Sequence, residues 1–389
     1  METVAVASET SNLAVLELFT ERRELMSLPV LEQDRPIGLI SRNIFLSQMS
    51  KPYYHELYGK KSCIAFMDKA PLIVDAAMSI EELTFRAVES GEKALADGFI
   101  VSRHERLAGV GFGLQLMNVV ANMQAEKNRQ IMHSIAYASV IQRSLLRPSE
   151  QALAATLPDA HLEWQPRDVV GGDFYHFARY PDGWFGAIAD CTGHGVPGAF
   201  MTLITSSILT QALQQSGPRD PAGLLAEVSR GVKTLLGQQD AVPAGALAAG
   251  SNDGMDAGFL WFDQASSTLH FAGARMALYL LEPGQPAVQA IDGERMGVGY
   301  TDTPADYVWH NRSLSVQAGS LLLLTTDGLI DQIGGPRDIA YGKRRMRDIL
   351  LAQRDASASE AASALLGDFL DWQGEQPRRD DLTFFCFRP

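Results

Sequence analysis

The sequence predicts an α+β protein in three parts: a duplicated α/β unit, one long helix and a C-terminal α+β sandwich. Strand and helix patterns between residues 10 and 112 occur twice in the same order, and residues 114–147 contain neither glycine nor proline. After about residue 158, strands are grouped with a few long helices instead of alternating strictly with them. A chain of 389 residues exceeds one ordinary core, and we expect domains at 1–112, 113–150 and 151–389.

Composition excludes several classes of function. At 46% hydrophobic and 20% charged, the chain resembles a globular protein, and its net charge of −13 argues against partners such as nucleic acid or anionic membrane. The three cysteines lie far apart without C-x-x-C spacing, so neither a disulfide framework nor a zinc site is expected. The acidic start of the chain does not resemble a signal peptide, and no apolar run approaches 18 residues. We therefore expect a cytoplasmic protein.

The duplicated unit begins with a helix at 13–19, strands at 28–31 and 37–40, and a helix at 42–49. Its second copy holds a strand at 72–74, a helix that starts after Ser79, and strands at 98–101 and 107–110. Ser79 and Glu82 have the spacing of a capping box. The stretch Leu-Pro-Val-Leu-Glu-Gln-Asp-Arg-Pro-Ile-Gly-Leu-Ile-Ser-Arg resembles a CBS domain, and the duplication resembles a CBS pair.

That resemblance implies an adenine nucleotide as a candidate ligand of the first part. Gly38 and Ser41 match the nucleotide-binding pattern of CBS domains, but Ile44 stands at its acidic position. In the second copy, Phe112 and Gln115 occupy the two polar positions. A purely structural or dimerising pair is the alternative.

The long helix carries one apolar stripe. Its members recur in steps of three and four, interrupted by the charged stretch 124–130, and are Leu116, Val120, Met123, Ile131, Ile135, Ala138, Ile141 and Leu145. We expect the helix to end at Arg147–Pro148, because proline disfavours helix at the residue before it. The stripe predicts a coiled-coil linker and a homodimer, and a helix packed on its own domain is the alternative.

The third part is predicted to contain strands at 161–165, 184–190, 258–263, 268–272, 277–281, 320–325 and 383–388. Its helices are expected at 199–214, 221–236, 345–352 and 357–370. The segment 241–250, rich in alanine and glycine, is expected to be a mobile loop.

Five aspartates lie beside glycines or at the ends of apolar strands: Asp173, Asp190, Asp327, Asp380 and Asp381. Carboxylates without a matching cysteine or histidine set suit Mg²⁺ or Mn²⁺. Two such ions, about 3.5–4 Å apart, can generate a hydroxide nucleophile and offset charge on phosphoryl oxygens. Glycines at 171, 172, 193 and 328 would let the backbone approach the ions. The pattern predicts a metal-dependent phosphatase with two divalent metal ions.

Four ordered segments resemble the SpoIIE-like branch of the type 2C metal-dependent serine/threonine phosphatases. They are Val-Gly-Gly-Asp-Phe-Tyr, Asp-Cys-Thr-Gly-His-Gly-Val-Pro-Gly-Ala, Leu-Leu-Thr-Thr-Asp-Gly-Leu and Arg-Asp-Asp-Leu-Thr-Phe. Upstream, Ile141-Gln-Arg-Ser-Leu-Leu is similar to that branch's entry helix, so the resemblance covers about residues 140–389. It implies an α-β-β-α sandwich and a phosphorylated regulatory partner, a STAS-type anti-sigma-factor antagonist in a partner-switching pathway.

Carried over by position, the resemblance makes Asp190 the bridging, catalytic carboxylate and the backbone carbonyl of Cys191 its neighbouring ligand. Asp173 would hold one ion, and Asp327 with Asp380 the other. Asp381 stands where relatives have Asn or Asp, so it is either a further metal ligand or a residue that supports one.

Three further residues are candidates for contacts with substrate. His194 could donate a proton to the leaving oxygen, or simply belong to a tight turn. Arg167 and Arg275 could bind the substrate phosphate, or be structural arginines. Asp253 and Asp256 would approach a third metal or form a solvated turn. The alternative from another class is a non-catalytic, partner-binding module on a phosphatase fold.

Overall fold

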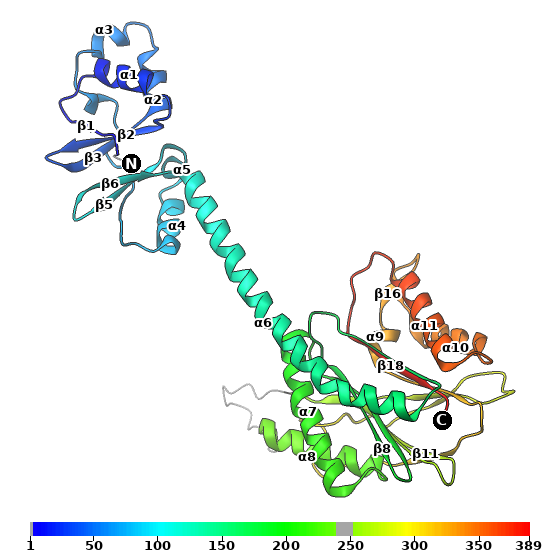
Figure 1. Cartoon of the computed structure of the whole chain (residues 1–389). Helices are drawn as coiled ribbons and strands as arrows, with labels where there is room; N and C mark the ends of the chain where they lie inside the picture. The colour runs from blue at the N-terminus through cyan, green and yellow to red at the C-terminus, as the bar shows by residue number, and fades with distance from the viewer. Residues whose placement is uncertain (1–2, 239–251) are drawn as a thin grey trace. The chain divides into compact units, whose positions relative to one another are not determined.

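A computed structural model describes residues 3–238 and 252–389, so the expected mobile loop at 241–250 lies outside the described residues. The chain divides into two compact units, Met1–Ile131 (unit 1) and Met132–Pro389 (unit 2), shown in Figure 1. Helix α6 (Gly113–Thr156) begins in unit 1 and ends in unit 2. The boundaries predicted at 112 and 150 stay predictions.

Unit 1 contains two three-stranded sheets built in the same way. In each, a parallel pair of strands joined through helix is followed by an antiparallel hairpin. The strands are β1 (Val6–Ala7), β2 (Ser27–Glu32) and β3 (Arg35–Ser41), then β4 (Ile73–Asp75), β5 (Phe99–Arg103) and β6 (Arg106–Gly111). The helices are α1 (Asn12–Glu21), α2 (Arg42–Met49), α3 (Tyr54–Tyr58), α4 (Ile80–Glu89) and α5 (Glu92–Asp97).

The two hairpins of unit 1 share even their turn conformation. Gln33 and Asp34 have φ of 47° and 67°, and His104 and Glu105 have φ of 53° and 63°, so both turns have two consecutive left-handed residues. Ser79 caps α4 by accepting a hydrogen bond from the Glu82 amide at 3.2 Å. The expected duplication is therefore present, whereas the resemblance to a CBS pair stays a prediction.

The prediction that the long helix ends at Arg147–Pro148 was wrong, because α6 continues through Pro148 to Thr156. Packing in unit 2 stabilises the extra turns: Leu146 and Leu153 are buried, and Ser149 Oγ accepts a hydrogen bond from the Phe177 amide at 3.0 Å. These contacts offset the backbone hydrogen bond that proline cannot donate.

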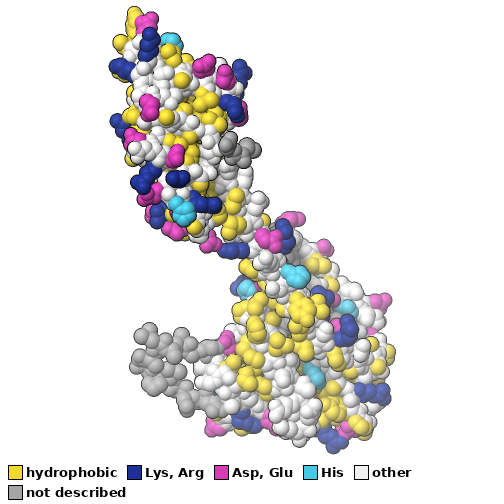
Figure 2. All heavy atoms as spheres, turned by 60° about the vertical axis from the view of Figure 1, so that its left-hand side comes forward, with side chains coloured by type: hydrophobic (Ala, Val, Ile, Leu, Met, Phe, Trp, Pro, Cys, Tyr) yellow, Lys and Arg dark blue, Asp and Glu magenta, His cyan; other side chains and the backbone are white. Residues whose placement is uncertain are grey.

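Much of the apolar surface of α6 is solvent-exposed. Leu116 is buried within unit 1, but several apolar side chains between Leu116 and Leu146 are exposed, including Met123, Ile131, Ile141 and Leu145. Figure 2 shows hydrophobic side chains gathered on the visible face of unit 2. Those exposed on α6 and α7 within this unit include Tyr137, Val140, Phe200 and Leu203.

Unit 2 is built on two antiparallel five-stranded sheets, with strand orders β14-β11-β10-β9-β8 and β13-β12-β15-β18-β7. The first sheet comprises β8 (Asp173–Tyr180), β9 (Gly183–Cys191), β10 (Met255–Asp263), β11 (Thr268–Ala274) and β14 (Arg312–Ser315). The second comprises β7 (Ala160–Gln165), β12 (Leu278–Leu281), β13 (Gln289–Ile291), β15 (Leu321–Thr325) and β18 (Leu382–Phe387). The main helices are α7 (Gly195–Ser216), α8 (Pro221–Leu236), α10 (Gly342–Ala352) and α11 (Ala358–Gln373).

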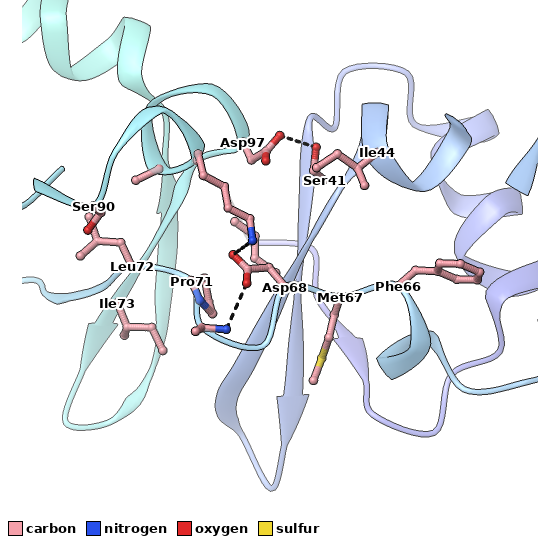
Figure 3. Close-up of a pocket in the computed structure, with 15 residues that line it drawn as sticks. Ser41, Ile44, Phe66, Met67, Asp68, Pro71, Leu72, Ile73, Ser90 and Asp97 are labelled. Carbon is pink, nitrogen blue, oxygen red and sulfur yellow. Dashed lines mark hydrogen bonds and ion pairs between the residues drawn. The ribbon is translucent and has the colours of Figure 1, made fainter. Parts of the chain in front are cut away.

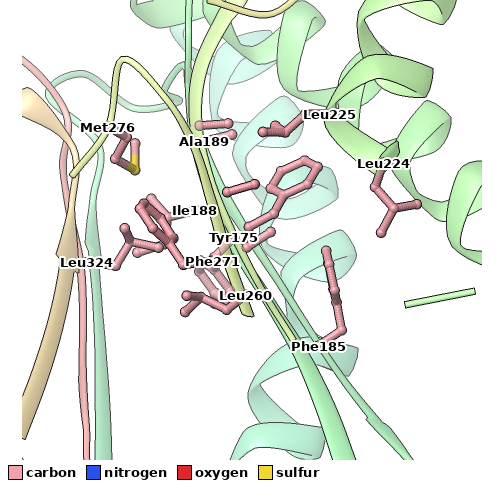
Figure 4. Packing of buried hydrophobic residues seen from close by; sticks show 14 of the residues in the cluster. Tyr175, Phe185, Ile188, Ala189, Leu224, Leu225, Leu260, Phe271, Met276 and Leu324 are labelled. Carbon is pink, nitrogen blue, oxygen red and sulfur yellow. The ribbon is translucent and has the colours of Figure 1, made fainter. Parts of the chain in front are cut away.

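Strand β15 shows how the layers are held together. Leu322 and Leu324 belong to the core between the two sheets, whereas Leu321 and Leu323 pack in the core beneath α10 and α11. Figure 4 shows Leu324 facing the first sheet, with Leu224 and Leu225 of α8 on that sheet's other side. Unit 2 is therefore a four-layer α-β-β-α sandwich, as expected.

Helix α7 is, among the described helices, the one that is long and apolar enough to cross a membrane. Its buried residues, including Met201, Leu209 and Leu213, lie in the core of unit 2 together with side chains of β8, β9 and α8. This core accounts for part of the apolar character of α7.

Candidate metal site

Three aspartates form one row across adjacent strands of the first sheet. Asp173, the first residue of β8, pairs directly with Asp190 near the end of β9, and Asp190 pairs on its other side with Asp256 of β10. Side chains opposite each other on antiparallel strands are close neighbours, and like charges in such positions repel. The row therefore concentrates negative charge at one end of the sheet.

The second sheet brings further carboxylates to the same place. Asp327 starts the short helix α9 (Asp327–Ile330) directly after β15, and Asp380 precedes β18. Burial raises the pKa of Asp190, and the charges of Asp173, Asp327 and Asp380 raise it further. Burial and the charge of Asp380 likewise raise the pKa of Asp327. The structure thus gathers Asp173, Asp190, Asp327 and Asp380 in one electrostatically coupled cluster, here called the carboxylate cluster.

The donors of the carboxylate cluster are those that Mg²⁺ and Mn²⁺ prefer, because all are hard oxygens. Mutual repulsion and burial leave the cluster short of positive charge, which a divalent cation would supply. Among the residues that the structure describes, no group of three or more His, Cys, Asp or Glu side chains is already arranged to hold a metal ion. The carboxylate cluster fits such an ion by the chemistry of its donors.

Asp381 lies differently from the other predicted metal residues. One of its oxygens accepts a hydrogen bond from the Arg167 amide at 2.5 Å, and the other accepts from the amides of Gly172 at 2.5 Å and Asp173 at 3.3 Å. Its carboxylate is buried and holds the backbone that leads into β8. This geometry favours the supporting role over that of a metal ligand.

Two glycines of the motifs are required by close backbone contacts. A Cβ at Gly172 would come within 2.4 Å of the Gly193 carbonyl oxygen, and one at Gly328 within 1.8 Å of the Asp381 carbonyl oxygen. These glycines let the loops that carry Asp173, Asp190 and Asp327 pack against one another.

Three other side chains touch the Asp173 loop, and sequence reasoning gave them no role there. Thr326 Oγ1 donates to Asp173 Oδ2 at 2.8 Å, and Trp164 Nε1 donates to the Asp173 carbonyl at 3.0 Å. Buried Gln142 of α6 donates to the Gly171 carbonyl at 2.8 Å and accepts from the Gly171 amide at 3.2 Å. Thr326 and Gln142 lie inside the sequence motifs that resemble the family, and this position could have marked them as candidates.

Cys191 can contribute to a metal site only through its backbone. Burial raises the pKa of its thiol, and its Sγ lies 3.4 Å from Thr205 Oγ1 of α7. The expectation that its carbonyl is a metal ligand stays a prediction.

Arg275 lies beside the aspartate row, in a left-handed backbone conformation with φ of 57°. Its guanidinium is 3.7 Å from both Asp256 and Asp302 and stacks over the ring of Tyr300. Burial raises the pKa of Asp256 to about 6, and the charge of Arg275 opposes that rise. In this structure the positive charge beside Asp256 comes from the guanidinium of Arg275.

The remaining predicted residues lie on the loops around the carboxylate cluster. The exposed Arg167 donates from Nη1 to the Arg379 carbonyl at 3.3 Å, next to Asp380 in the chain. His194, the N-cap residue of α7, has its Nδ1 3.0 Å from Asp168 Oδ2, and Asp168 was not anticipated. The backbone amide of Asp253 is bonded to Gln238 at 2.9 Å.

Comparison with known proteins identifies the family of unit 2. Residues 181–389 match the model of the Stage II sporulation protein E (SpoIIE) family. The SiaA-PP2C domain of Pseudomonas aeruginosa is 36% identical, with a TM-score of 0.60, over 68% of this chain and 99% of that domain. No curated protein sequence matched the chain.

Two more distant structures also match. A SpoIIE fragment with the PP2C phosphatase domain, from Bacillus subtilis, is 17% identical, with a TM-score of 0.46, over 59% of this chain and 61% of the other. The RsbU and RsbW domains of a Mycobacterium tuberculosis protein are 20% identical, with a TM-score of 0.44, over 60% of each chain. Through the match over residues 181–389 and the 36% identity, the chain belongs to the SpoIIE family of PP2C-type phosphatase domains.

Proposed function

We propose that this chain is a metal-dependent phosphatase that removes phosphate from serine or threonine of a regulatory phosphoprotein. The observation that carries the proposal is the carboxylate cluster, in which four aspartates from both sheets lie close enough to raise one another's pKa. A bound cation would relieve this repulsion, and membership of the SpoIIE family supports a phosphatase.

Asp173, Asp190, Asp327, Asp380 and the Cys191 carbonyl would hold two ions, Mn²⁺ or Mg²⁺. When bound, the ions supply a deprotonated water and positive charge for the phosphoryl oxygens. Asp381 and Thr326 keep Asp173 in place through the hydrogen bonds described above. Arg275 lies beside Asp256, and Arg167 contacts Arg379, which precedes Asp380 in the chain. The guanidinium fork of either residue would bind substrate phosphate.

A substrate panel tests this proposal. We expect the purified chain with Mn²⁺ to hydrolyse phosphoserine and phosphothreonine peptides faster than ATP at equal concentration. Hydrolysis of ATP or small phosphoesters alone would contradict a phosphoprotein substrate. A partner-binding module without catalysis would instead bind its partner equally well with Asp190→Asn and hydrolyse nothing in either form.

The partner proposed from the family resemblance is a phosphorylated STAS-type anti-sigma-factor antagonist, encountered in the cytoplasm. The measurement is release of phosphate from such a protein after phosphorylation by its cognate kinase. Hydrolysis of phosphopeptides without hydrolysis of this protein would remove the partner and leave the phosphatase.

Unit 1 is proposed to bind a regulatory small molecule, with an adenine nucleotide as first candidate. A cavity of about 490 Å³ lies between its two copies, lined by Ser41, Ile44, Met67, Lys93 and Asp97 among others (Figure 3). Ser41 Oγ donates to Asp97 Oδ1 at 2.6 Å. A carboxylate thus lies at this cavity although position 44 is isoleucine.

Calorimetric titration with AMP and ATP tests this site. We expect Asp97→Asn to weaken binding, while Asp34→Asn, an exposed aspartate of the β2–β3 turn, leaves it unchanged. Absence of binding to wild type would leave unit 1 a structural or dimerising pair.

A homodimer through the exposed apolar side chains of α6 is a related proposal, which light scattering of wild type and Ile131→Glu would check.

A further inference from the structure

An acid–histidine pair lies at the edge of the carboxylate cluster, on the two loops that supply Asp173 and Asp190. Asp168 precedes β8, and its Oδ2 lies 3.0 Å from Nδ1 of His194, which follows β9. Both side chains are 48% exposed, so the pair is open to a substrate from solution. Within the described residues, no other hydrogen bond to the His194 ring is present, and Nε2 is the nitrogen free to meet a substrate.

Both loops are fixed by contacts on either side of the pair. On the Asp168 loop, the Arg167 amide donates to Asp381, and Gly171 is bonded in both directions to Gln142. On the other loop, the Cys191 amide donates to the Gly172 carbonyl at 3.1 Å.

The position of the His194 loop is further set by Thr192, whose amide donates to the Gly254 carbonyl at 2.9 Å. A Cβ at Gly195, which has φ of 63°, would lie 3.3 Å from Asp168 Oδ2, so the chain passes close by this carboxylate. Most exposed ion pairs are held loosely and contribute little. This pair differs because the backbone on both sides is anchored.

We propose that Asp168 is a positioning residue that orients His194 as proton donor to the leaving oxygen of a phosphoserine or phosphothreonine substrate. This inference rests on the proposed phosphatase function. A carboxylate that accepts a hydrogen bond from Nδ1–H fixes the tautomer and the ring orientation.

The step conserves atoms and charge. As the phosphorus–oxygen ester bond breaks, its electron pair goes to the serine or threonine oxygen, and that oxygen takes the proton from His194 Nε2. Water supplies the oxygen that phosphate gains, and the proton that this water loses goes to solvent. His194 is left neutral with Nδ1–H still donating to Asp168, and a proton from solvent restores the imidazolium.

The basicity of the leaving group separates this role from a structural one. An alkoxide leaving group needs a proton as the bond breaks, whereas p-nitrophenolate is weakly basic and leaves without one. General acid catalysis contributes about 10²–10⁴-fold where it is needed. Loss of the donor should therefore slow hydrolysis of a phosphoserine peptide far more than that of p-nitrophenyl phosphate.

The experiment measures kcat and KM of the full chain with Mn²⁺ on these two substrates. We expect His194→Gln to lower kcat on the peptide by about 10²-fold and Asp168→Asn by about tenfold, each with KM nearly unchanged. On p-nitrophenyl phosphate we expect losses at least tenfold smaller. The double variant should match His194→Gln alone, because the two residues act as a unit, and Asp168→Glu should recover part of the loss.

The matched control is Asp182→Asn, which removes a partly exposed aspartate that pairs with Arg219 at the β8–β9 turn. It should leave both rates unchanged. Nitrogen NMR of the His194 ring in EDTA gives a readout that needs no activity, and Asp168→Asn should shift its tautomer populations.

Equal losses on both substrates, additive effects in the double variant or an unchanged His194 tautomer would each overturn the inference while leaving the phosphatase intact. A wild-type chain that hydrolyses neither substrate with Mn²⁺ would overturn the proposed function itself, and the inference with it.

Discussion

Asp190 and Asp381 differ in the groups around their carboxylates. Burial and neighbouring carboxylates raise the pKa of Asp190. Burial also raises the pKa of Asp381, but three backbone amides that donate to its carboxylate oppose that rise. In the metal-free protein, Asp190→Asn should therefore raise the free energy of unfolding by about 1 kcal/mol, because it removes repulsion. Asp381→Asn should lower it by about 2–4 kcal/mol, because charge-assisted hydrogen bonds are lost.

Urea unfolding in EDTA measures both changes. Both variants should also lose activity, so only the stability measurement separates the two roles. A loss of stability in Asp190→Asn similar to that in Asp381→Asn would show that the two aspartates have the same role.

His176 is expected to make the free energy of unfolding depend on pH between about 4 and 6.5. Burial lowers its pKa from 6.5 to about 4, so the unfolded chain binds a proton there before the folded chain does. The stability associated with the neutral ring is complete above pH 6.5 and is lost as pH falls toward 4. The loss amounts to at most about 3 kcal/mol.

Replacing His176 by glutamine should remove this dependence. Unfolding midpoints at pH 7 and pH 5 are the measurement, and the decrease between them should be smaller in His176→Gln than in wild type. An equal decrease in both proteins would mean that other groups govern the acid side.

At the level of single residues, local motifs predicted the candidates better than their partners. Asp173, Asp190, Asp327 and Asp380 could be found from the sequence because each lies in a short motif, and the structure gathers them. Asp168 could not be assigned to His194 in this way, since only the fold brings their two loops together. Asp381 could be named but not distinguished from a ligand, because its three amide donors come from residues more than two hundred positions away.

At the level of elements, amphipathic periodicity gave accurate bounds where the core imposes it. Helix α8 was expected at 221–236 and helix α2 at 42–49, and both have these bounds. Strand β8 was not anticipated, nor were the short strands β13, β14, β16 (Ile333–Gly334) and β17 (Ile339–Ala340) or the helix α9. Gly171 and Gly172, directly before β8, are residues typical of a turn. The strand that follows is recognised only from its pairing with β9.

Helix α6 carries the clearest correction and a stability prediction. Because Pro148 lies inside the helix, Pro148→Ala should restore one backbone hydrogen bond and remove the contact of the ring with the preceding turn. We expect the unfolding free energy to rise by about 1–3 kcal/mol. A decrease in the unfolding free energy would contradict this prediction and would indicate that proline stabilises the helix at this position.

At the scale of the molecule, α6 is the covalent connection between the unit with the proposed ligand cavity and the unit with the carboxylate cluster. Deleting two residues within 124–130 should rotate one end of the helix against the other by over half a turn, at about 3.6 residues per turn. If α6 transmits a signal, basal phosphatase activity should change severalfold in this variant.

A four-residue deletion in the same stretch is the matched control, since it nearly restores the helical phase. Activity equal to wild type in both deletions would remove the regulatory role of α6. A fragment of residues 132–389, which corresponds to unit 2, should retain metal-dependent turnover in either case.

The central claim is that the carboxylate cluster binds divalent cations and thereby makes the chain a phosphatase. Its most direct test is hydrolysis of p-nitrophenyl phosphate by the full chain with Mn²⁺, with Mg²⁺ and with EDTA, for wild type and Asp190→Ala. We expect turnover with a divalent cation, none in EDTA, and a loss of at least about 10²-fold in the variant. Turnover that persists in EDTA, or that Asp190→Ala leaves intact, would contradict the claim.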